Sequence, residues 1–369
     1  MKEIDRFNEA IHNAGPLLSD IKKNKKIIGY VCSYAPEELI YAAGWHPMRL
    51  FPSQSDIILA EQHLQVYCCS LVRGILEDSL IGRLDFLDGA VFPHTCDTIQ
   101  RLSDIWRLNQ KYEFFWDVVL PVKLNTQSAR NYMVDILNRF KKDLETAIDS
   151  PITKNDLMSA VGTYNSIRKN LSRIYRLQCQ TPGIIKSQDL LTLVKGSMIM
   201  ERHDAESLLQ KIRKTLEKKK PVSHKGKRIL ISGAVCDRPD IYQIIESSGG
   251  MVVADDLCTG QRWFDGEIQV KDDPVVAIAN RYADRMICPA KHIATTARGE
   301  HLVLLAKKVQ ADGVIFTFLK FCDPHAFDLP YLKEYLDQAG IKTLHLDLDG
   351  QQQSPGQFST RIETFIHML

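Results

Sequence analysis

The stretch DGAVFPHTCDTIQ, residues 88–100, predicts a β-strand that runs directly into an α-helix. An Asp-Gly turn leads into an apolar, β-branched run, and a Cys-Asp pair follows where the helix is expected to begin. DGVIFTFLKFCDPHAFDLPYLKEYL, residues 312–336, repeats this outline far downstream. The repeat indicates corresponding strand–helix units in two related halves of the chain, with chance similarity as the alternative explanation.

Strands and helices alternate around both copies, over 25–51 and 88–148 and again over 227–348. Between these parts, 152–178 and 187–219 have helical periodicity with no strand between them. This order predicts an α/β fold with two doubly wound parallel sheets, flavodoxin-like or Rossmann-like, and a helical subdomain between them. The expected domains are 1–150, 151–222 and 223–369.

Composition is that of an ordinary soluble globular protein, with 44% hydrophobic and 25% charged residues. The net charge of +2 gives no field that would attract nucleic acid, and the basic run 217–228 lacks the aromatic residues that stack on bases. This run is typical of a solvated linker. The N-terminal pattern is an amphipathic helix rather than a signal peptide, and no apolar run approaches the ~20 residues that span a bilayer. We therefore expect a cytoplasmic protein with neither a nucleic-acid nor a membrane partner.

Nine cysteines need an explanation in a reducing compartment, where disulfides rarely persist. They are Cys32, Cys68, Cys69, Cys96, Cys179, Cys236, Cys258, Cys288 and Cys322. None stand in CxxC spacing, so a zinc ribbon, a thioredoxin motif and a ferredoxin run are all excluded. Any thiol site must therefore be assembled by the fold.

Cys96 and Cys322 follow strands, and the carboxyl ends of parallel strands are where ligands bind in open sheets. A thiol at a helix N-terminus has its thiolate favoured by the helix dipole. Cys68 and Cys69 are expected on a helix over 61–82, pointing about 100° apart, so that one of them faces the site. Three thiolates without a fourth suggest an iron–sulfur cluster with one open iron. The alternative for any single cysteine is a small buried hydrophobe, which we accept for Cys179 and Cys288.

Motifs along nearly the whole chain resemble those of the 2-hydroxyacyl-CoA dehydratase family, which also contains the B and C subunits of ATP-dependent benzoyl-CoA reductase. The chain looks most like the smaller, beta-type subunit. The segments that carry the resemblance are, in order, GYVCSYAPEELIYAAGWHPMRLF, YCCSLVRGILEDSLIG, LDGAVFPHTCDTIQRLSDIW, GGMVVADDLCTGQRWF, LKFCDPHAFDLPYLKEYLDQAGIKTLHLDLD and GQFSTRIETFIHML.

The resemblance implies a [4Fe-4S] cluster held by Cys69 in YCCSLVR, Cys96 in PHTCDT and Cys322 in KFCDPH. Cys69 is preferred to Cys68 because the family's cysteine directly precedes the Ser-Leu of this motif. Such enzymes are oxygen-sensitive and pair with a homologous larger subunit as a heterodimer. A separate ATP-dependent iron–sulfur activator supplies the electron that converts an (R)-2-hydroxyacyl-CoA to a ketyl radical anion, which expels the hydroxyl group.

Other residues at strand ends are candidates for the same crevice. Ser33 and Glu38 could contact the substrate thioester, with helix capping as the alternative, and His325 is a candidate proton donor. Thr259 and Arg262 could approach an anionic group, or could form a plain surface turn.

Three activities remain open for the subunit beside dehydration. It could reduce the aromatic ring of benzoyl-CoA, or relay electrons without meeting substrate. The family also has a reductase branch with a double-cubane cluster, which needs more cysteines, and Cys32, Cys236 and Cys258 keep that branch open.

Overall fold

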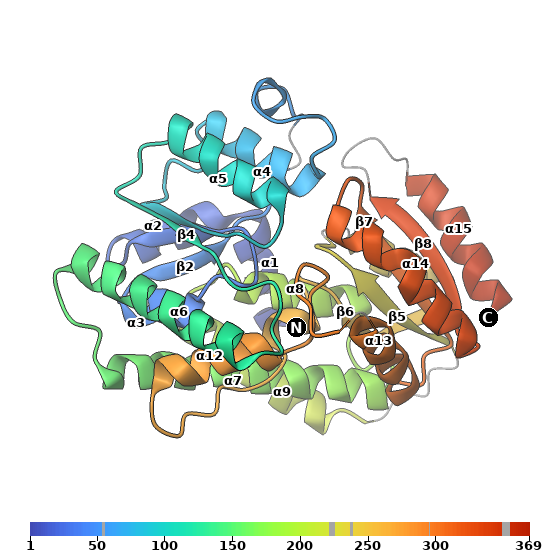
Figure 1. Ribbon diagram of the computed structural model, residues 1–369. Coiled ribbons are helices and arrows are strands. Elements are labelled where there is room, and N and C mark those ends of the chain that lie inside the picture. Colours follow the sequence, from blue (N-terminus) through green and yellow to red (C-terminus); the bar gives the residue numbers. More distant parts are fainter. Residues whose placement is uncertain (54–55, 221–225, 237–238, 295, 349–354) are drawn as a thin grey trace.

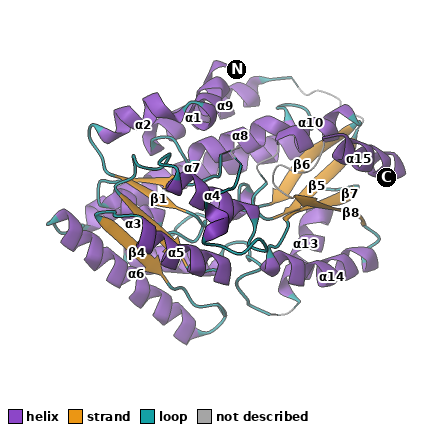
Figure 2. Cartoon of the chain, turned by 90° about the horizontal axis from the view of Figure 1, so that it is seen from above, coloured by secondary structure: helices purple, strands orange, loops and turns teal. Residues whose placement is uncertain are grey.

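Two four-stranded parallel sheets form the framework of the computed structural model, which describes residues 1–53, 56–220, 226–236, 239–294, 296–348 and 355–369 (Figure 1). The predicted α/β class with two doubly wound sheets is confirmed. Seen from above, the sheets lie on opposite sides of the molecule with helices between them (Figure 2).

The two sheets share one strand order. The first contains β1 (Ile27–Tyr30), β2 (His46–Arg49), β3 (Gly89–Pro93) and β4 (Phe114–Val118), in the order β2-β1-β3-β4. The second contains β5 (Lys227–Gly233), β6 (Gly250–Asp256), β7 (Gly313–Leu319) and β8 (Lys342–Leu348), in the order β6-β5-β7-β8. Both orders follow the flavodoxin-like pattern, in which ligands bind where the order reverses, between the first and third strands. β3 and β7 occupy equivalent places, which gives the repeated Cys-Asp outline a topological meaning.

Helices cover both sheets. In the first half they are α1 (Lys2–His12), α2 (Ala14–Lys22), α3 (Glu37–Ala42), the 3-10 turn η1 (Ala60–Gln62), α4 (Ser70–Leu80), α5 (Asp97–Asn109) and α6 (Gln127–Ile148). In the second half they are α10 (Pro239–Ser247), α11 (Gln261–Phe264), α12 (Pro274–Asp284), α13 (Ala297–Lys308), α14 (Asp323–Gln338) and α15 (Pro355–Met368).

The central helices are α7 (Lys154–Gln180), α8 (Ser187–Ser197) and α9 (Arg202–Lys218). Thr153 and Asp156 form a capping box that fixes the start of α7. The continuous helical pattern predicted over 187–219 is wrong at its middle, where the chain leaves the helix. The reason is that its carbonyls bind β2: Met198 accepts a hydrogen bond from the Arg49 N–H, and Ile199 from the His46 ring.

The helix predicted over 61–82 is also wrong in its first part, since α4 begins only at Ser70. The Glu77 carboxylate accepts hydrogen bonds from the backbone N–H groups of Ile58 and Ala60, which folds the preceding segment back as turns. Cys68 and Cys69 therefore precede the helix instead of lying on it.

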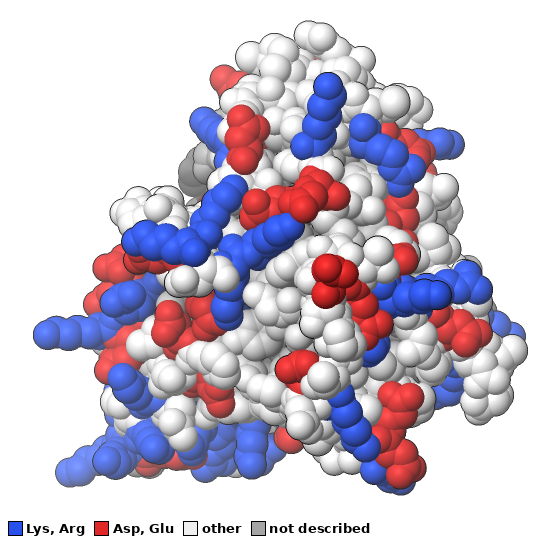
Figure 3. Space-filling view, turned by 90° about the vertical axis from the view of Figure 1, so that its left-hand side faces the viewer, with Lys and Arg blue, Asp and Glu red and all other residues white. Residues whose placement is uncertain are grey.

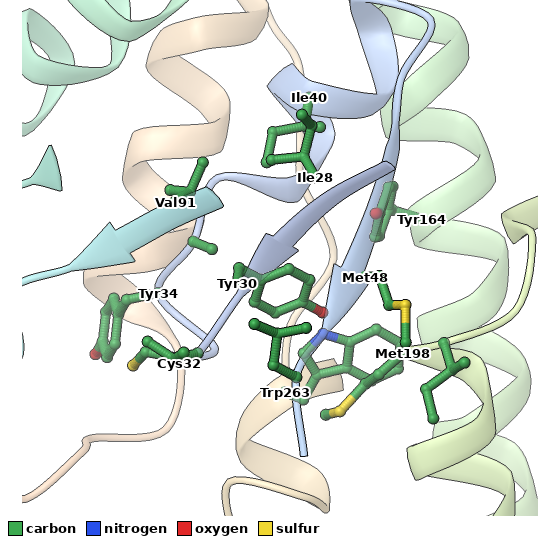
Figure 4. Packing of buried hydrophobic residues seen from close by; sticks show 14 of the residues in the cluster. Ile28, Tyr30, Cys32, Tyr34, Ile40, Met48, Val91, Tyr164, Met198 and Trp263 are labelled. Atoms are coloured by element: carbon green, nitrogen blue, oxygen red, sulfur yellow. The ribbon is translucent and has the colours of Figure 1, made fainter. Parts of the chain in front are cut away.

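The halves share much of their core. α11 and α12 pack against α7, and α12 also against α6, so this part of the second half covers the first. Figure 4 shows Trp263 beside Tyr30, Met48 and Met198 within one buried cluster. The domain boundaries themselves stay a prediction, and the predicted basic linker lies partly outside the described residues, at 221–225.

The surface carries mixed charge. On the face drawn in Figure 3, Lys and Arg side chains are interspersed with Asp and Glu. Within the described part of the chain, no helix combines the length and the apolar character needed to cross a membrane.

Candidate functional site

Three cysteines occupy the same local position in three different helices. Cys69, Cys96 and Cys322 are the N-cap residues of α4, α5 and α14, respectively. Ser, Thr, Asp and Asn are the usual N-caps because their oxygens accept the free N–H groups of the first turn. A cysteine there instead places sulfur at the positive end of the helix dipole. The fold thus places a cysteine sulfur at the N-terminus of each of these three helices.

These three thiols converge. Electrostatic interactions with Cys69 and Cys96 raise the pKa of Cys322, and Cys69 likewise acts on Cys96. Burial is the larger effect at each of them and raises the pKa of Cys69 to about 11. The neutral thiol is therefore favoured until a metal replaces the proton.

The donor atoms of the three residues are those that an iron–sulfur cluster uses. No group of three or more His, Cys, Asp or Glu side chains in the described ranges is placed to hold one metal ion. Ligands of an iron–sulfur cluster bind different irons and so stand further apart than the ligands of one zinc. A purely thiol donor set is also what such clusters use. Cys69, Cys96 and Cys322 therefore fit the group that the sequence suggested, and their assignment as ligands stays a prediction.

The neighbouring Cys68 faces a different environment. Its sulfur lies 3.9 Å from Oε1 of Gln65, and its electrostatic neighbours are Asp97, Arg73 and Asp323. Cys69 is the member of the doublet that acts on Cys96 and Cys322. Cys69 is therefore the member of the doublet that lies near the other two thiols, and its role as a ligand stays a prediction.

A second trio of thiols adjoins the first. Burial raises the pKa of the Cys288 thiol to about 11, and electrostatic interactions with Cys258 and Cys32 also raise it. The two trios are close together, because Cys32 interacts electrostatically with Cys96, and Cys258 with Cys322. Hydrogen bonds fix two of these sulfurs: Cys32 accepts one from Thr95 Oγ1 at 3.3 Å, and Cys258 one from Arg262 Nη1 at 3.4 Å.

Sequence reasoning treated Cys288 as a packing residue, and the structure brings it into the second trio. It follows no strand, so the strand-end rule gave no signal for it. A usable signal is the pair of cations nearby in the chain, Arg285 and Lys291. Cys236 is fully buried and lies beside Tyr242 instead.

The three candidate catalytic residues have different surroundings. Ser33 is buried, and its carbonyl and hydroxyl oxygens accept hydrogen bonds from Arg285. Glu38 is fully buried with both oxygens engaged, one by Arg168 and one by the Tyr282 hydroxyl. Burial is the largest single effect on Glu38 and opposes its ionisation, but the charges of Arg168 and Arg281 and the hydrogen bonds to the carboxylate together outweigh burial and lower the pKa. Glu38 is thus held as a carboxylate in an ion pair.

His325 is buried at the start of α14, and its backbone N–H donates to the Cys322 carbonyl. Burial lowers its pKa well below the usual range, so the imidazole is neutral. Its Nδ1 has no hydrogen-bond partner in the structure, and its ring packs 4.9 Å from that of Phe318.

The surface-turn alternative is wrong for Thr259 and Arg262, because both are buried. Arg262 bonds Asp256 at 2.7 Å and the Gly233 carbonyl, which closes the ends of β5 and β6.

A cavity of about 390 Å³ lies next to the first trio. Its walls include Cys322, Phe318, Leu329 and His345, from the ends of β7 and β8 and the first turns of α14. This volume is within the range of small-molecule sites.

Comparison with known proteins decides the family. The family model described as 2-hydroxyglutaryl-CoA dehydratase, D-component, matches residues 32–369. The chain belongs to this family. It is 26% identical to the (R)-phenyllactyl-CoA dehydratase beta subunit of Clostridium sporogenes, with 94% of this chain and 92% of the relative covered. It is 28% identical to the C subunit of benzoyl-CoA reductase from Thauera aromatica, over 84% and 82% of the two chains. The beta subunit of (R)-2-hydroxyglutaryl-CoA dehydratase from Acidaminococcus fermentans is 25% identical over 99% and 98%.

Proposed function

We propose that this family member is the [4Fe-4S]-containing subunit of an oxygen-sensitive (R)-2-hydroxyacyl-CoA dehydratase. The observation that carries the proposal is the convergence of Cys69, Cys96 and Cys322 at three helix N-termini. Three thiolates would hold the cluster and leave one iron without a protein ligand. When bound, the cluster supplies one-electron transfer at low potential.

The residues of the chain have separate tasks in this proposal. The N-termini of α4, α5 and α14 stabilise negative charge at the site through their dipoles. The cavity beside Cys322 gives an acyl group room at the site. Ser33 and His325 are the candidates for substrate contact, whereas the ion pair of Glu38 with Arg168 supports a positioning role for the turn after β1.

The names of the relatives support a partner. Two of the three relatives are called beta subunits, and we propose that this chain likewise pairs with a homologous larger subunit as a heterodimer. An ATP-dependent iron–sulfur activator and an acyl-CoA substrate complete the proposed system.

Iron and sulfide analysis of the anaerobically purified chain with its partner tests the ligand set. We expect Cys69→Ala, Cys96→Ala and Cys322→Ala each to lose the roughly four irons of one cluster. Cys68→Ala is the matched control and should retain them. Iron that survives the triple replacement, and that a further Cys288→Ala replacement does not remove, would refute the assignment.

Product analysis distinguishes dehydration from reduction of an aromatic ring. Ring reduction is tested because the chain is related to the C subunit of benzoyl-CoA reductase. The complex is incubated anaerobically with activator, ATP and either an (R)-2-hydroxyacyl-CoA or benzoyl-CoA. An enoyl-CoA product supports the dehydratase, and a cyclic dienoyl-CoA supports the reductase. With neither product from a fully loaded complex, an electron-relay subunit is favoured.

A double-cubane reductase is the second candidate, and a specific observation favours it. Cys32, Cys258 and Cys288 form a second thiol group that adjoins the first. This candidate predicts about eight irons per chain, of which some depend on Cys288. A wild-type count of about four, unchanged in Cys288→Ala, would exclude it.

A further inference from the structure

Two buried cations beside the second trio have no acidic partner. Arg285 is 4% exposed and Lys291 is 0% exposed. Arg285 donates to the Ser33 carbonyl at 2.9 Å, and Lys291 donates to the Leu120 carbonyl at 3.0 Å. Neither side chain forms an ion pair with a carboxylate of the described residues, and Nε of Arg285 has no hydrogen-bond partner. Burying a cation without an anion is strongly unfavourable.

Two other buried arginines of this region are compensated. Arg262 pairs with Asp256, and Arg298 pairs with Asp256 and Asp328. The contrast shows that the fold supplies carboxylates to balance buried arginines at this edge of the second sheet. Arg285 and Lys291 are not paired in this way. Arg281 of α12 is also buried without an ion pair to any described residue, and it donates to the backbone carbonyls of Gly266, Trp263 and Asp265. The charges that act most strongly on Arg281 are those of Arg168, Glu38 and Arg285, whereas the charges that act on Arg285 and Lys291 include Cys32.

Two carboxylates of a cavity that Arg285 lines are engaged by other groups. Arg285 also lines an open cavity of about 740 Å³ together with Asp265 and Asp284. Asp265 accepts a hydrogen bond from the Met286 backbone, and Asp284 forms an ion pair with Arg130. Neither of these two carboxylates forms an ion pair with Arg285 in the described chain, and Glu267, Asp272 and Asp273 line the same cavity.

The two cations lie against one aromatic ring and close to two of the thiols. The guanidinium of Arg285 lies 3.9 Å from the centroid of Tyr34, and Nζ of Lys291 lies 5.7 Å from it. Both cations interact electrostatically with Cys32, and Lys291 also interacts with Cys288. If these thiols only filled space, two buried positive charges would remain unbalanced.

We propose that Arg285 and Lys291 are the counter-charges of an anionic iron–sulfur cluster held by Cys32, Cys258 and Cys288, and that they set its reduction potential. This inference rests on the double-cubane form of the proposed function. Thiolate-bound clusters carry negative charge, and one-electron reduction adds one more. A fixed cation nearby stabilises the reduced state and so raises the potential. Both residues act through the cluster and are positioning residues.

Redox titration of the anaerobically purified full chain with dithionite, followed by electron paramagnetic resonance, tests this role. In Lys291→Met and Arg285→Met we expect the equilibrium constant for one-electron reduction to fall threefold to tenfold. At 59 mV per factor of ten for one electron, this is a shift of about 28 to 59 mV to lower potential. Arg285→Lys keeps the charge and should keep the wild-type potential. Lys195→Met is the matched control, because Lys195 is a buried lysine that packs on Phe51 instead.

The outcomes distinguish a failure of the counter-charge role from the absence of the second cluster. A wild-type iron count of about eight with unchanged potentials in both Met variants overturns the counter-charge role and leaves the second cluster standing. A count of about four that Cys288→Ala does not lower removes the second cluster and the inference with it. Circular dichroism checks that each variant folds, and Lys291→Gln replaces Lys291→Met if the latter does not. An unchanged potential in Lys291→Gln is equally decisive against the role.

Discussion

His46 shows how burial fixes the protonation state of one residue. It is fully buried in β2, and its Nε2–H donates to the Ile199 carbonyl at 2.8 Å. Nδ1 has no partner, so protonation there would bury a charged donor with nothing to accept its hydrogen bond. Burial, reinforced by the charge of Arg202, lowers the pKa of His46 to about 3. The folded chain therefore carries this residue as neutral imidazole.

The depressed pKa of His46 makes stability depend on pH. Below the unfolded pKa of about 6.5, the unfolded chain binds a proton that the folded chain rejects. The contribution of His46 is therefore fully present above that pH, and falls by roughly 1.4 kcal/mol per unit as pH drops toward about 3. In His46→Gln, which keeps a hydrogen-bond donor for the Ile199 carbonyl, we expect the free energy of unfolding to lose this part of its dependence on pH. Urea unfolding at pH 7, 6 and 5 measures it, and equal slopes in both proteins would contradict the assignment.

The candidate site was only partly predictable at this scale. Cys96 and Cys322 could be proposed from the chain alone, because a Cys-Asp pair after an apolar strand places sulfur at the mouth of a helix. Cys69 needed the family resemblance, since the apolar spacing over 61–82 favours a longer helix than the one that forms. Cys288 follows no strand, so the strand-end rule missed it. Its place depends on buried cations and thiols that only the folded chain brings together.

Strand contacts in the second sheet leave no room for a side chain at Gly233. β5 and β7 pair Gly233 with Thr317, and a Cβ at Gly233 would lie 2.0 Å from the Thr317 carbonyl oxygen. The obstacle is backbone, which cannot move aside without disturbing the ladder. Gly162 in α7 is the opposite case, exposed and with open space around its Cβ position.

These two glycines give a matched pair of substitutions. Gly233→Ala should lower the free energy of unfolding by about 1–3 kcal/mol, because the strands must separate to admit the methyl group. Gly162→Ala should raise it by roughly 0.5–1 kcal/mol, because alanine favours the helix. Thermal and denaturant unfolding measure both. A stabilising effect of Gly233→Ala would mean that β5 and β7 are further apart than the structure shows.

The elements were easier to predict than their ends. Period-two and β-branched runs located the strands of both sheets, and Gly44, at a φ of 78°, follows the end of α3. The split between α8 and α9 could not be read from periodicity. It exists because Met198 and Ile199 bind β2, a contact made between residues about 150 positions apart.

The whole molecule is joined by buried polar contacts between its halves. Nε1 of Trp263 donates to Glu37 at 2.7 Å, and the Tyr282 hydroxyl donates to the Ala35 carbonyl at 2.6 Å. Tyr175 of the central helix α7 donates to Asp255 at 2.7 Å. Buried groups of this kind are costly to separate, since each would lose its partner before reaching water. Opening one half therefore exposes polar groups of the other.

We therefore expect the two sheets to unfold together, although a chain of this length could unfold in two steps. Trp263→Phe should lower the free energy of unfolding by about 1–3 kcal/mol, because it removes the donor to the Glu37 carboxylate. Trp116→Phe is the control, since Nε1 of Trp116 has no partner to lose, and its effect should be smaller. Tryptophan fluorescence and far-ultraviolet circular dichroism should follow one urea transition with the same midpoint in each variant. Separate midpoints, or a Trp263→Phe effect confined to one of two transitions, would show that the halves are independent despite the contacts between them.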